Sequence, residues 1–269
     1  MPELPEVETI ARGLQSRVAG DSVAAVWIGS RKQVLRSSAA KIASILTGKK
    51  ILRVHRMGKH IVFDLGKKLA EAQWIVHLGM TGRMLVCEPE AESVKHTHLS
   101  ATLSSGRELR FIDARMFGKL SVAVPPTFDP GGVEPLETDV ATFVGLFRGR
   151  KTPIKSALLN QKLLRGVGNI YADEALARVG IRPQRKAASI SRADLERLLA
   201  AVQAVLREAI KLGGSSVSDY VGADGEEGFF QLQHRVYGRE GEPCLVCGTP
   251  IRRLVIGGRS SHYCPKCQK

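Results

Sequence analysis

The chain has no long hydrophobic run and few cysteines. None of its apolar stretches approaches the roughly 20 residues needed to cross a bilayer. Its first residues show neither the basic region nor the apolar core of a secretion signal. Only five of its 269 residues are cysteine, and four of these lie in the last 26 residues. These features predict a cytosolic protein without a disulfide framework.

Acidic residues are too few to balance the basic ones. The chain has 40 Lys and Arg against 26 Asp and Glu, a formal charge of +14. Residues 1–130 contain 19 basic and 12 acidic residues and the remainder contains 21 and 14, so each part contributes +7. Basic side chains gain from counterion release at phosphates, which favours a polyanionic partner over a merely solubilising charge. Both halves are expected to face this partner, as two walls of a cleft would.

Residues 1–124 are predicted to form a strand-rich domain, a β-sandwich with helices at its flanks. Val7, Ile10, Leu14 and Val18 recur at helical spacing. The stretches that follow are rich in apolar and β-branched residues, as strands are. They are SVAAVWIG, KILRV, HIVFDL, WIVHLGM, HLSATL, ELRFID and KLSVAV.

Beyond a linker at residues 125–137, rich in Pro and Gly, the pattern becomes helical over 138–231. Two short helical segments flank RGVGN in a helix-turn-helix-like arrangement. A long amphipathic helix capped by Ser191 follows, and the composition of residues 213–231 predicts a long loop. Residues 232–269 carry the clustered cysteines. The predicted fold class is therefore α+β with several domains.

The chain opens with the stretch MPELPEVETI. Pro5, Glu6 and Glu8 fit an ordinary helix start, because proline suits the first turn and carboxylates interact favourably with the positive end of the helix dipole. This interpretation leaves Pro2 and Glu3 unexplained.

Four cysteines have the spacing of a metal site, Cys244-x2-Cys247-x16-Cys264-x2-Cys267. Two such knuckles can place four thiolates around one Zn²⁺ and leave no position open for water, which predicts a structural ion. A redox pair, the alternative for a single knuckle, does not account for two of them at this separation. Cys87 stands apart and is predicted to be a buried core thiol.

Two polar residues lie at positions suited to phosphate binding. Arg259 follows a Gly-Gly pair between the knuckles, so its guanidinium is either a phosphate ligand or a solvated group on a plain hairpin turn. Asn169 lies where RGVGN meets a helix. There it can bind phosphate or cap the helix, and the two roles are compatible.

Six motifs occur in order along the whole chain. They are PELPEVE, HLGMTG at 77–82, DARMFG at 113–118, GVGNIYADE at 166–174, VYGREGEPC at 236–244 and the two cysteine knuckles. Together they resemble the bacterial formamidopyrimidine-DNA glycosylase family. The resemblance implies a base-excision-repair enzyme that removes 8-oxoguanine and ring-opened purines from double-stranded DNA. It also implies that a helix-two-turn-helix domain and a zinc finger follow the sandwich along the chain.

The resemblance assigns the chemistry to the N-terminus. Once Met1 is removed, Pro2 has a free secondary amine, and since α-amino groups have pKa values of about 8, a usable fraction is neutral and nucleophilic at pH 7. A Schiff-base intermediate and β,δ-elimination would follow. Glu3 is expected to act as general acid or base, with Glu6 as a supporting carboxylate.

Further roles are implied by motif position. Lys59 in RMGKHIVFDL matches a proton donor in β-elimination, and Arg259 matches an arginine that contacts phosphates beside the lesion and acts in δ-elimination. Met80, Arg115 and Phe117 match the residues that fill the gap left by the extruded base. The DNA contacts implied by the resemblance are His96, Arg115, Arg150, Lys155 and Asn169.

Two positions depart from the family's usual DPRRFG run. Ala114 replaces a proline and Met116 replaces a basic residue, while Arg115 and Phe117 are retained. Reading of the opposite base is expected to persist. These two departures are expected to affect the rigidity of the loop and one phosphate contact.

Two other functions stay open. An endonuclease VIII-type glycosylase would act on oxidised pyrimidines with the same proline chemistry, but PELPEVE and the 213–231 loop, which in the family closes over the flipped base, argue against it. A non-catalytic zinc-finger DNA-binding protein would account for the charge and the cysteines, but not for Pro2, Glu3 or Lys59. The resemblance also implies a monomer in the bacterial cytosol or nucleoid, without a membrane partner.

Overall fold

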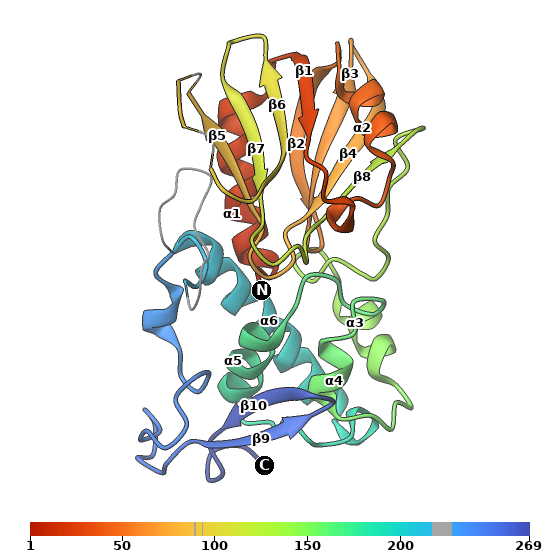
Figure 1. Cartoon of the computed structure of the whole chain (residues 1–269). Coiled ribbons are helices and arrows are strands. Elements are labelled where there is room, and N and C mark those ends of the chain that lie inside the picture. The colour runs from red at the N-terminus through yellow and green to blue at the C-terminus, as the bar shows by residue number, and fades with distance from the viewer. Residues whose placement is uncertain (89, 93, 217–227) are drawn as a thin grey trace. The chain divides into compact units, whose positions relative to one another are not determined.

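The computed structural model of the protein (Figure 1) describes residues 1–88, 90–92, 94–216 and 228–269. The chain folds into two compact units. Unit 1 comprises Met1–Asp129 and Gly213–Gly228, and unit 2 comprises Pro130–Leu212 and Phe229–Lys269. Within the described ranges, no helix is long and apolar enough to span a membrane.

Unit 1 contains the predicted β-sandwich. Its strands are β1 (Val23–Ile28), β2 (Lys50–Met57), β3 (His60–Gly66), β4 (Ala70–His77), β5 (Arg83–Cys87), β6 (Thr97–Leu103), β7 (Glu108–Ile112) and β8 (Lys119–Ala123). They form two antiparallel sheets with the orders β1-β6-β7-β5 and β2-β3-β4-β8. Side chains of both sheets, including Phe63, Trp74 and Phe111, share one hydrophobic core.

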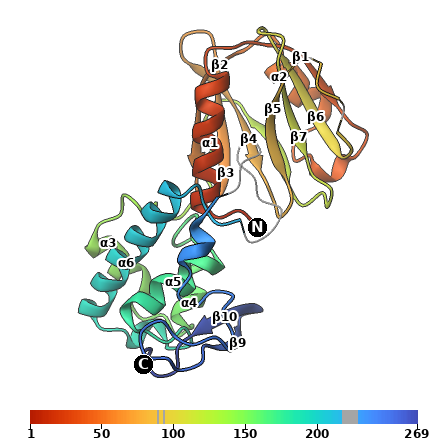
Figure 2. The same cartoon turned by 90° about the vertical axis from the view of Figure 1, so that its left-hand side faces the viewer.

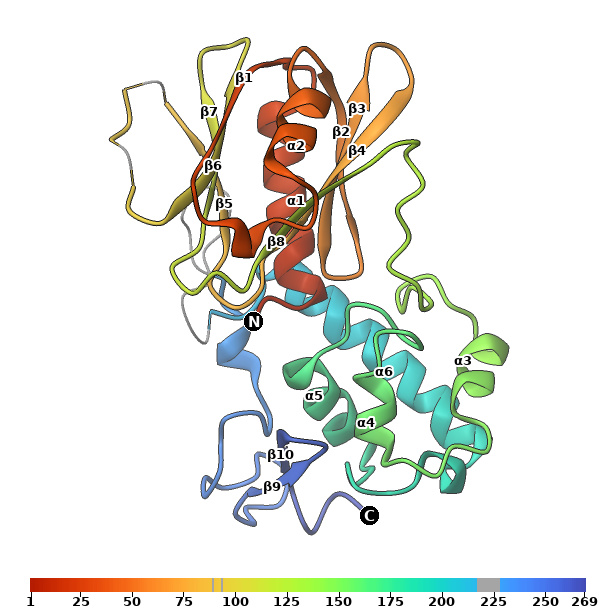
Figure 3. The same ribbon diagram turned by 45° about the vertical axis from the view of Figure 1, so that its right-hand side comes forward.

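Two helices close the edges of this sandwich. The helix α1 (Leu4–Val18) packs on β2, β3 and β5, and α2 (Ala39–Leu46), preceded by the short η1 (Lys32–Val34), packs on β1, β4 and β8. Figure 2 shows α1 lying along β2, and Figure 3 shows α2 in front of α1 between the sheets. The predicted apolar stripe of α1, from Val7 to Val18, is buried, as helical periodicity requires.

Two crossovers run side by side at one end of the sandwich. Residues 78–82 lead from β4 to β5 and residues 113–118 lead from β7 to β8, so each passes from one sheet to the other. The β2–β3 turn lies at the same end, because His60 pairs with His77. Two cross-strand pairs bracket the crossovers: His77–Lys119 and Arg83–Ile112.

The start of α1 also lies at this end. Near the end of β2, the Arg56 Nε donates to Glu8 in the first half of α1 at 2.8 Å. Earlier in β2, the Val54 amide donates to the Gln15 side chain, further along α1, at 2.5 Å. The N-terminus, the β2–β3 turn and both crossovers therefore gather at one end of unit 1.

Unit 2 is mainly helical. Both α3 and α5 contact α6, and α4 contacts α5. The long helix α6 is capped by Ser191, whose Oγ accepts from the Asp194 amide at 3.1 Å, and its predicted apolar stripe is buried. The helices are α3 (Val140–Phe147), α4 (Ile154–Leu158), α5 (Asn169–Val179), η2 (Ala187–Ser189), α6 (Arg192–Lys211) and η3 (Phe230–Gln233).

A β-hairpin near the C-terminus completes unit 2. It consists of β9 (Arg252–Ile256) and β10 (Arg259–Tyr263), and β10 contacts α5. Gly257 and Gly258 form its two-residue turn with φ values of 55° and 75°. Tight hairpins need positive φ at these positions, which glycine adopts without strain.

Several sequence expectations differ from the structure. No helix was predicted over α2, and β5 was not among the predicted strands. Cys87 is half-buried at the end of β5 rather than a core thiol, and burial raises its pKa. The described residues 213–216 and 228 cluster with unit 1. Of the predicted lesion-recognition loop, residues 217–227 lie outside the described residues.

Candidate active site and nucleic-acid interface

The start of the chain is buried apart from Met1. Pro2, Glu3 and Glu6 are all buried, with 3% and 2% exposure for the two carboxylates. Glu3 is the N-cap of α1, and the Glu3 amide donates to Glu6 Oε2 at 2.8 Å as part of a capping box. This contact fixes the backbone beside Pro2.

Glu6 also contacts the described start of the 213–228 segment. Its Oε1 accepts from the Ser215 amide at 2.8 Å. Gly214 has φ +86° and packs so closely that a Cβ there would lie 2.8 Å from Glu6 Oε1. The helix-start interpretation of Glu6 was therefore incomplete: one buried carboxylate joins the backbone beside Pro2 to this segment.

Lys59 lies in the β2–β3 turn and is 8% exposed. Arg56 donates to Glu8 Oε2 on α1 and, from Nη1, to the Gly58 carbonyl at 3.3 Å. These contacts tie the turn that carries Lys59 to α1. Burial alone raises the pKa of Glu8, but hydrogen bonds from Arg12 and Arg56 outweigh it and hold that pKa below its usual value.

Two histidines adjoin this turn. His60 and His77 face each other on β3 and β4, with ring centroids 5.0 Å apart. Burial, His60 and two nearby lysines lower the pKa of His77 to about 4, and burial lowers the pKa of His60. His77 is therefore neutral at pH 7, and its Nδ1 accepts from the Gly79 amide at 3.1 Å.

The predicted gap-filling residues come from the two crossovers. Met80 is 43% exposed and Phe117 is 48% exposed, although both are large and apolar. The Arg115 guanidinium lies 4.8 Å from the centroid of the Phe117 ring, in a cation–π arrangement. The exposed His96 is close by, since its carbonyl accepts from the Asp113 amide at 3.0 Å. The three predicted gap-filling residues and the predicted DNA contact His96 therefore lie at one end of unit 1.

In unit 2, the hairpin carries an exposed arginine beside the start of α5. The Asn169 Nδ2 donates to Ser260 Oγ at 3.4 Å, and Arg259 precedes Ser260 in the chain and is exposed. Gly168, not Asn169, occupies the N-cap position of α5, so the capping alternative for Asn169 is not realised. Arg150, after α3, is exposed.

Lys155 is placed differently from the prediction of a direct phosphate contact. Its side chain is 0% exposed, and its Nζ lies 2.7 Å from Asp173 Oδ1 and donates to the Ser260 carbonyl at 2.6 Å. Asp173 Oδ2 accepts from the His262 amide at 2.9 Å. The pair therefore attaches β10 to α4 and α5, and an enclosed ammonium is not available to a phosphate at the surface.

Glu174, which sequence reasoning missed, is also fully buried. Its carboxylate accepts from three consecutive amides, those of Arg235, Val236 and Tyr237, each at 2.9 Å. These hydrogen bonds offset the cost of burying the charge and attach the segment before the cysteine knuckles to α5. The sequence feature that could have pointed to Glu174 is the pair of adjacent acidic residues, Asp173 and Glu174, within a mostly apolar helix.

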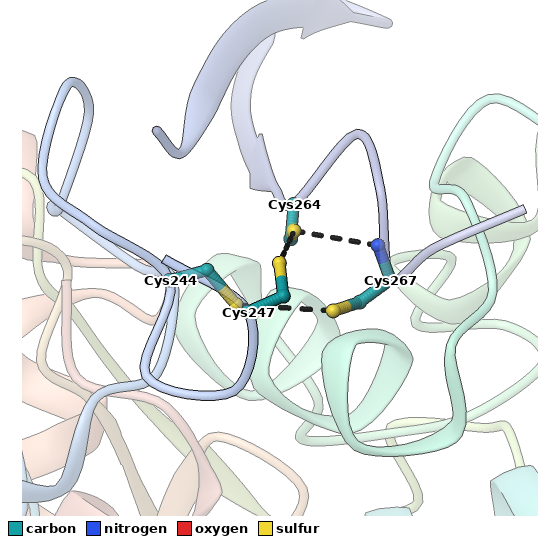
Figure 4. A group of neighbouring side chains, drawn as sticks. All are labelled: Cys244, Cys247, Cys264 and Cys267. Carbon is teal, nitrogen blue, oxygen red and sulfur yellow. Dashed lines mark hydrogen bonds between the residues drawn. The ribbon is translucent and has the colours of Figure 1, made fainter. Parts of the chain in front are cut away.

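The four predicted cysteines form one cluster (Figure 4). Their Sγ atoms all lie within 4.8 Å of one another, with Cys244 and Cys267 3.9 Å apart and Cys247 and Cys264 3.5 Å apart. Zn–S bonds of about 2.3 Å in a tetrahedron require sulfurs about 3.8 Å apart, so the set fits one Zn²⁺. Gln268 supports the second knuckle by accepting from the Cys264 amide at 2.8 Å.

Family models match three successive parts of the chain. The N-terminal domain of formamidopyrimidine-DNA glycosylase matches residues 1–120, and the H2TH domain of the same family matches residues 132–221. The zinc finger found in FPG and IleRS matches residues 241–269.

Whole proteins match over the full length. The chain is 47% identical over 272 residues to the formamidopyrimidine-DNA glycosylase of Solibacter usitatus, with 100% of both chains covered. A complex between a Lactococcus lactis FPG variant and DNA containing Fapy-dG matches with a TM-score of 0.91 and 32% identity, again over 100% of both chains. A complex of MutM with DNA containing carbocyclic 8-oxo-G matches over the same extent with a TM-score of 0.91 and 33% identity.

Proposed function

This chain belongs to the formamidopyrimidine-DNA glycosylase family, and we propose that it is a bifunctional DNA glycosylase and abasic-site lyase acting on oxidised purines. The family membership predicted from the six motifs is confirmed along the whole chain. The related complexes with Fapy-dG and 8-oxo-G DNA support oxidised purines as substrates.

One observation carries the catalytic part of the proposal. The buried Pro2 and Glu3 lie at the same end of unit 1 as the turn that holds Lys59 and the crossovers that expose Met80 and Phe117. The candidate nucleophile, the candidate proton-transfer groups and the candidate wedge residues therefore share one end of unit 1, which supports the proposal. A protein that only binds DNA has no need for this arrangement.

The chemistry begins when Met1 is removed and the Pro2 nitrogen becomes a free secondary amine. The amine attacks C1′ of the damaged nucleotide, and the base leaves with the electron pair of the glycosidic bond. The attached nitrogen loses its proton, and the C1′–O4′ bond then breaks as O4′ takes up a proton, which opens the sugar and leaves an iminium between Pro2 and C1′. This iminium stays cationic, because the proline nitrogen has no further proton to lose. Its charge acidifies the C2′ protons, and loss of one of them expels the 3′ phosphate. A second elimination expels the 5′ phosphate, and water then hydrolyses the iminium, which frees the sugar remnant from Pro2.

Proton transfer falls to the groups nearest the nucleophile. Glu3 adjoins Pro2 in the chain and is shielded from water, so it can protonate the opening sugar and later take up a proton. Glu6 orients the backbone of Glu3. Lys59, in the turn that the Arg56–Gly58 hydrogen bond ties down, donates a proton during β-elimination.

Unit 2 supplies the phosphate contacts. Arg259 and Asn169 bind phosphates beside the lesion, and the exposed Arg150 adds a further contact. Lys155 acts indirectly, by holding Ser260 and hence the hairpin that presents Arg259. The four cysteines hold a structural Zn²⁺ that fixes the two knuckles on either side of that hairpin.

Borohydride trapping tests this function. The mature protein is incubated with a duplex that contains 8-oxoguanine opposite cytosine, and borohydride reduces any iminium to a stable crosslink. We expect a crosslink with this duplex and less with duplexes that contain dihydrouracil or thymine glycol. Binding without crosslinking would instead indicate a non-catalytic DNA-binding protein. Preferential crosslinking of the pyrimidine lesions would indicate an endonuclease VIII-type enzyme.

We also propose that one chain acts alone on each lesion, in the bacterial cytosol or nucleoid. Support comes from the fact that a single chain carries the candidate nucleophile, wedge and phosphate-binding residues. Mass photometry of the trapped complex is expected to give one chain per duplex, whereas two chains per duplex would contradict the proposal.

A further inference from the structure

The two crossovers that carry the wedge residues are packed backbone to backbone. Gly79, at φ +64°, lies so close to the second crossover that a Cβ there would be 2.5 Å from the Gly118 nitrogen and 2.5 Å from the Phe117 carbonyl carbon. A Cβ on Gly118 would lie 3.0 Å from the His77 carbonyl oxygen. Neither loop can move far without displacing the other, because no side chains separate them.

One buried carboxylate joins these loops. Asp113 is 0% exposed. Its Oδ1 accepts from the Thr81 hydroxyl in the first crossover at 2.5 Å and from the Arg115 amide at 3.1 Å, while its Oδ2 accepts from the Gly118 amide at 2.7 Å. Donors from both crossovers therefore converge on a single side chain.

The backbone of Asp113 is held as well. Its carbonyl accepts from His98 Nε2 at 2.8 Å, and its amide donates to the His96 carbonyl. These contacts bring the exposed His96 next to the same element. Sequence reasoning gave Asp113 no role, because it treated DARMFG only as the carrier of Arg115 and Phe117.

Met116 anchors the second crossover to the hydrophobic core of unit 1. It has φ +57°, an unusual conformation for a non-glycine residue, and its side chain packs against the hydrophobic core of unit 1. Lys119 Nζ donates to the Met116 carbonyl at 3.2 Å. The residue that departs from the family's basic position therefore points an apolar side chain inward, which secures the loop that presents Arg115 and Phe117.

We propose that Asp113, together with Thr81, is a positioning residue that makes the two crossovers one preformed wedge, so that Met80, Arg115 and Phe117 enter the DNA together. This inference rests on the proposed glycosylase function. Ordering the loops during folding removes an entropy cost that would otherwise oppose base extrusion. Asp113 itself touches neither the substrate nor the reacting atoms.

The chemistry of Asp113 makes the proposal testable with small changes. A carboxylate accepts hydrogen bonds on both oxygens, whereas the amide in Asp113→Asn must direct an NH₂ group at one of the donors. Thr81→Val removes one donor and keeps the shape, and Thr81→Ser keeps the hydroxyl. The matched control is Thr142→Val, which removes a Thr hydroxyl–Asp hydrogen bond of 2.9 Å to Asp139 in unit 2.

Three readouts separate positioning from chemistry. The first is single-turnover excision of 8-oxoguanine from a duplex, opposite cytosine and opposite adenine. The second is borohydride trapping on a preformed abasic site in single-stranded DNA, which needs no extrusion and no gap filling. The third is the fluorescence of 2-aminopurine placed beside the lesion, which rises when the base unstacks.

We expect duplex excision to slow by about tenfold in Thr81→Val and about 30-fold in Asp113→Asn, since each leaves buried polar groups imperfectly paired. The rise of the 2-aminopurine fluorescence should slow in parallel. The ratio of the excision rate opposite cytosine to the rate opposite adenine should fall. Thr81→Ser and Thr142→Val should behave as the wild type, and single-strand trapping should stay within about twofold for every variant, because the nucleophile is untouched.

Two results would overturn the proposal. One is wild-type duplex excision in Thr81→Val, which would show that the hydroxyl–carboxylate contact is dispensable. The other is an equal loss of duplex excision and single-strand trapping in Thr81→Val, which would show a general structural defect. Because Thr81→Val is conservative, the test holds even if Asp113→Asn fails to fold. Absence of trapping by the wild type would instead contradict the proposed function.

Discussion

Both units bury charged residues, but they use them differently. In unit 1, the buried Glu3 and Lys59 are the groups proposed to move protons, and the carboxylates of Glu6 and Glu8 organise the backbone around them. In unit 2, the buried Lys155 and Asp173 pair with each other, and the exposed Arg259 is the residue proposed to bind phosphate.

The difference follows from the two tasks. Bond making requires fixed geometry and few competing waters, so reactive groups benefit from burial. Phosphate binding requires a cation that can reach the polyanion, so burial is useful only for the supports behind it. Buried charged groups beside Pro2 in unit 1 are therefore proposed to move protons, whereas in unit 2 the buried Lys155 and Asp173 are proposed to support the exposed Arg259.

Blocking the Pro2 nitrogen is expected to have the largest effect. A short N-terminal Gly-Ser extension acylates this nitrogen and should reduce excision and trapping by at least about 10⁴-fold, because the nucleophile is lost. The same extension at the C-terminus is the matched control and should leave both activities unchanged. Substantial trapping by the N-terminally extended protein would show that the covalent chemistry does not depend on the Pro2 nitrogen of unit 1.

Breaking the buried pair of unit 2 is expected to affect stability before chemistry. Asp173→Asn leaves the Lys155 charge uncompensated and should lower the free energy of unfolding by about 3 to 5 kcal/mol. Urea unfolding measures this change. The control Asp194→Asn, on the exposed start of α6, should cost less than about 1 kcal/mol. A similarly small loss for Asp173→Asn would contradict the supporting role of the pair.

The neutral His77 of unit 1 predicts a pH dependence. Because its folded pKa of about 4 lies below the usual value of 6.5, the unfolded chain takes up the proton first, so stability is lost as the pH falls from 6.5 towards 4. His60, Lys59 and Lys119 all oppose protonation of His77.

The loss attributable to His77 should reach about 2 to 3 kcal/mol at pH 4, and should vanish above pH 7. Urea unfolding of the wild type and of His77→Gln is measured across this pH range. The difference between the two free energies of unfolding isolates the contribution of His77, because His60 titrates in both proteins. Parallel curves for the two proteins would contradict the assignment.

Removing the exposed arginine of unit 2 is expected to have the smallest effect. Arg259→Ala should weaken DNA binding by about tenfold, reduce the slope of log affinity against log salt by about one, and leave stability unchanged. Arg252→Ala, at an exposed position on the same hairpin, is the control. An unchanged salt slope in Arg259→Ala would show that Arg259 does not contact a phosphate.

Sequence patterns predicted the elements that repeat over several turns. The 15 residues of α1 and the 20 residues of α6 bury apolar side chains at regular spacing, and both helices were predicted. The eight residues of α2 bury only Ile42 and Leu46, which is too little repetition for a pattern.

The candidate site was predictable where its residues adjoin in the chain. Pro2 and Glu3 are neighbours, and each cysteine knuckle is a local motif. Lys155 could not be placed in the same way, because its burial depends on a contact with Ser260, 105 positions away. The role of Asp113 likewise depends on Thr81, which belongs to another crossover. Such roles arise only when distant segments pack together.

The central claim is that the buried N-terminus of unit 1 forms the covalent bond, and mapping the trapped crosslink tests it directly. After borohydride reduction on a duplex with 8-oxoguanine, the complex is digested and the modified peptide is identified by mass spectrometry. We expect the sugar on the nitrogen of Pro2, in a protein that has lost Met1. A crosslink on Lys59, or on any residue of unit 2, would contradict the account.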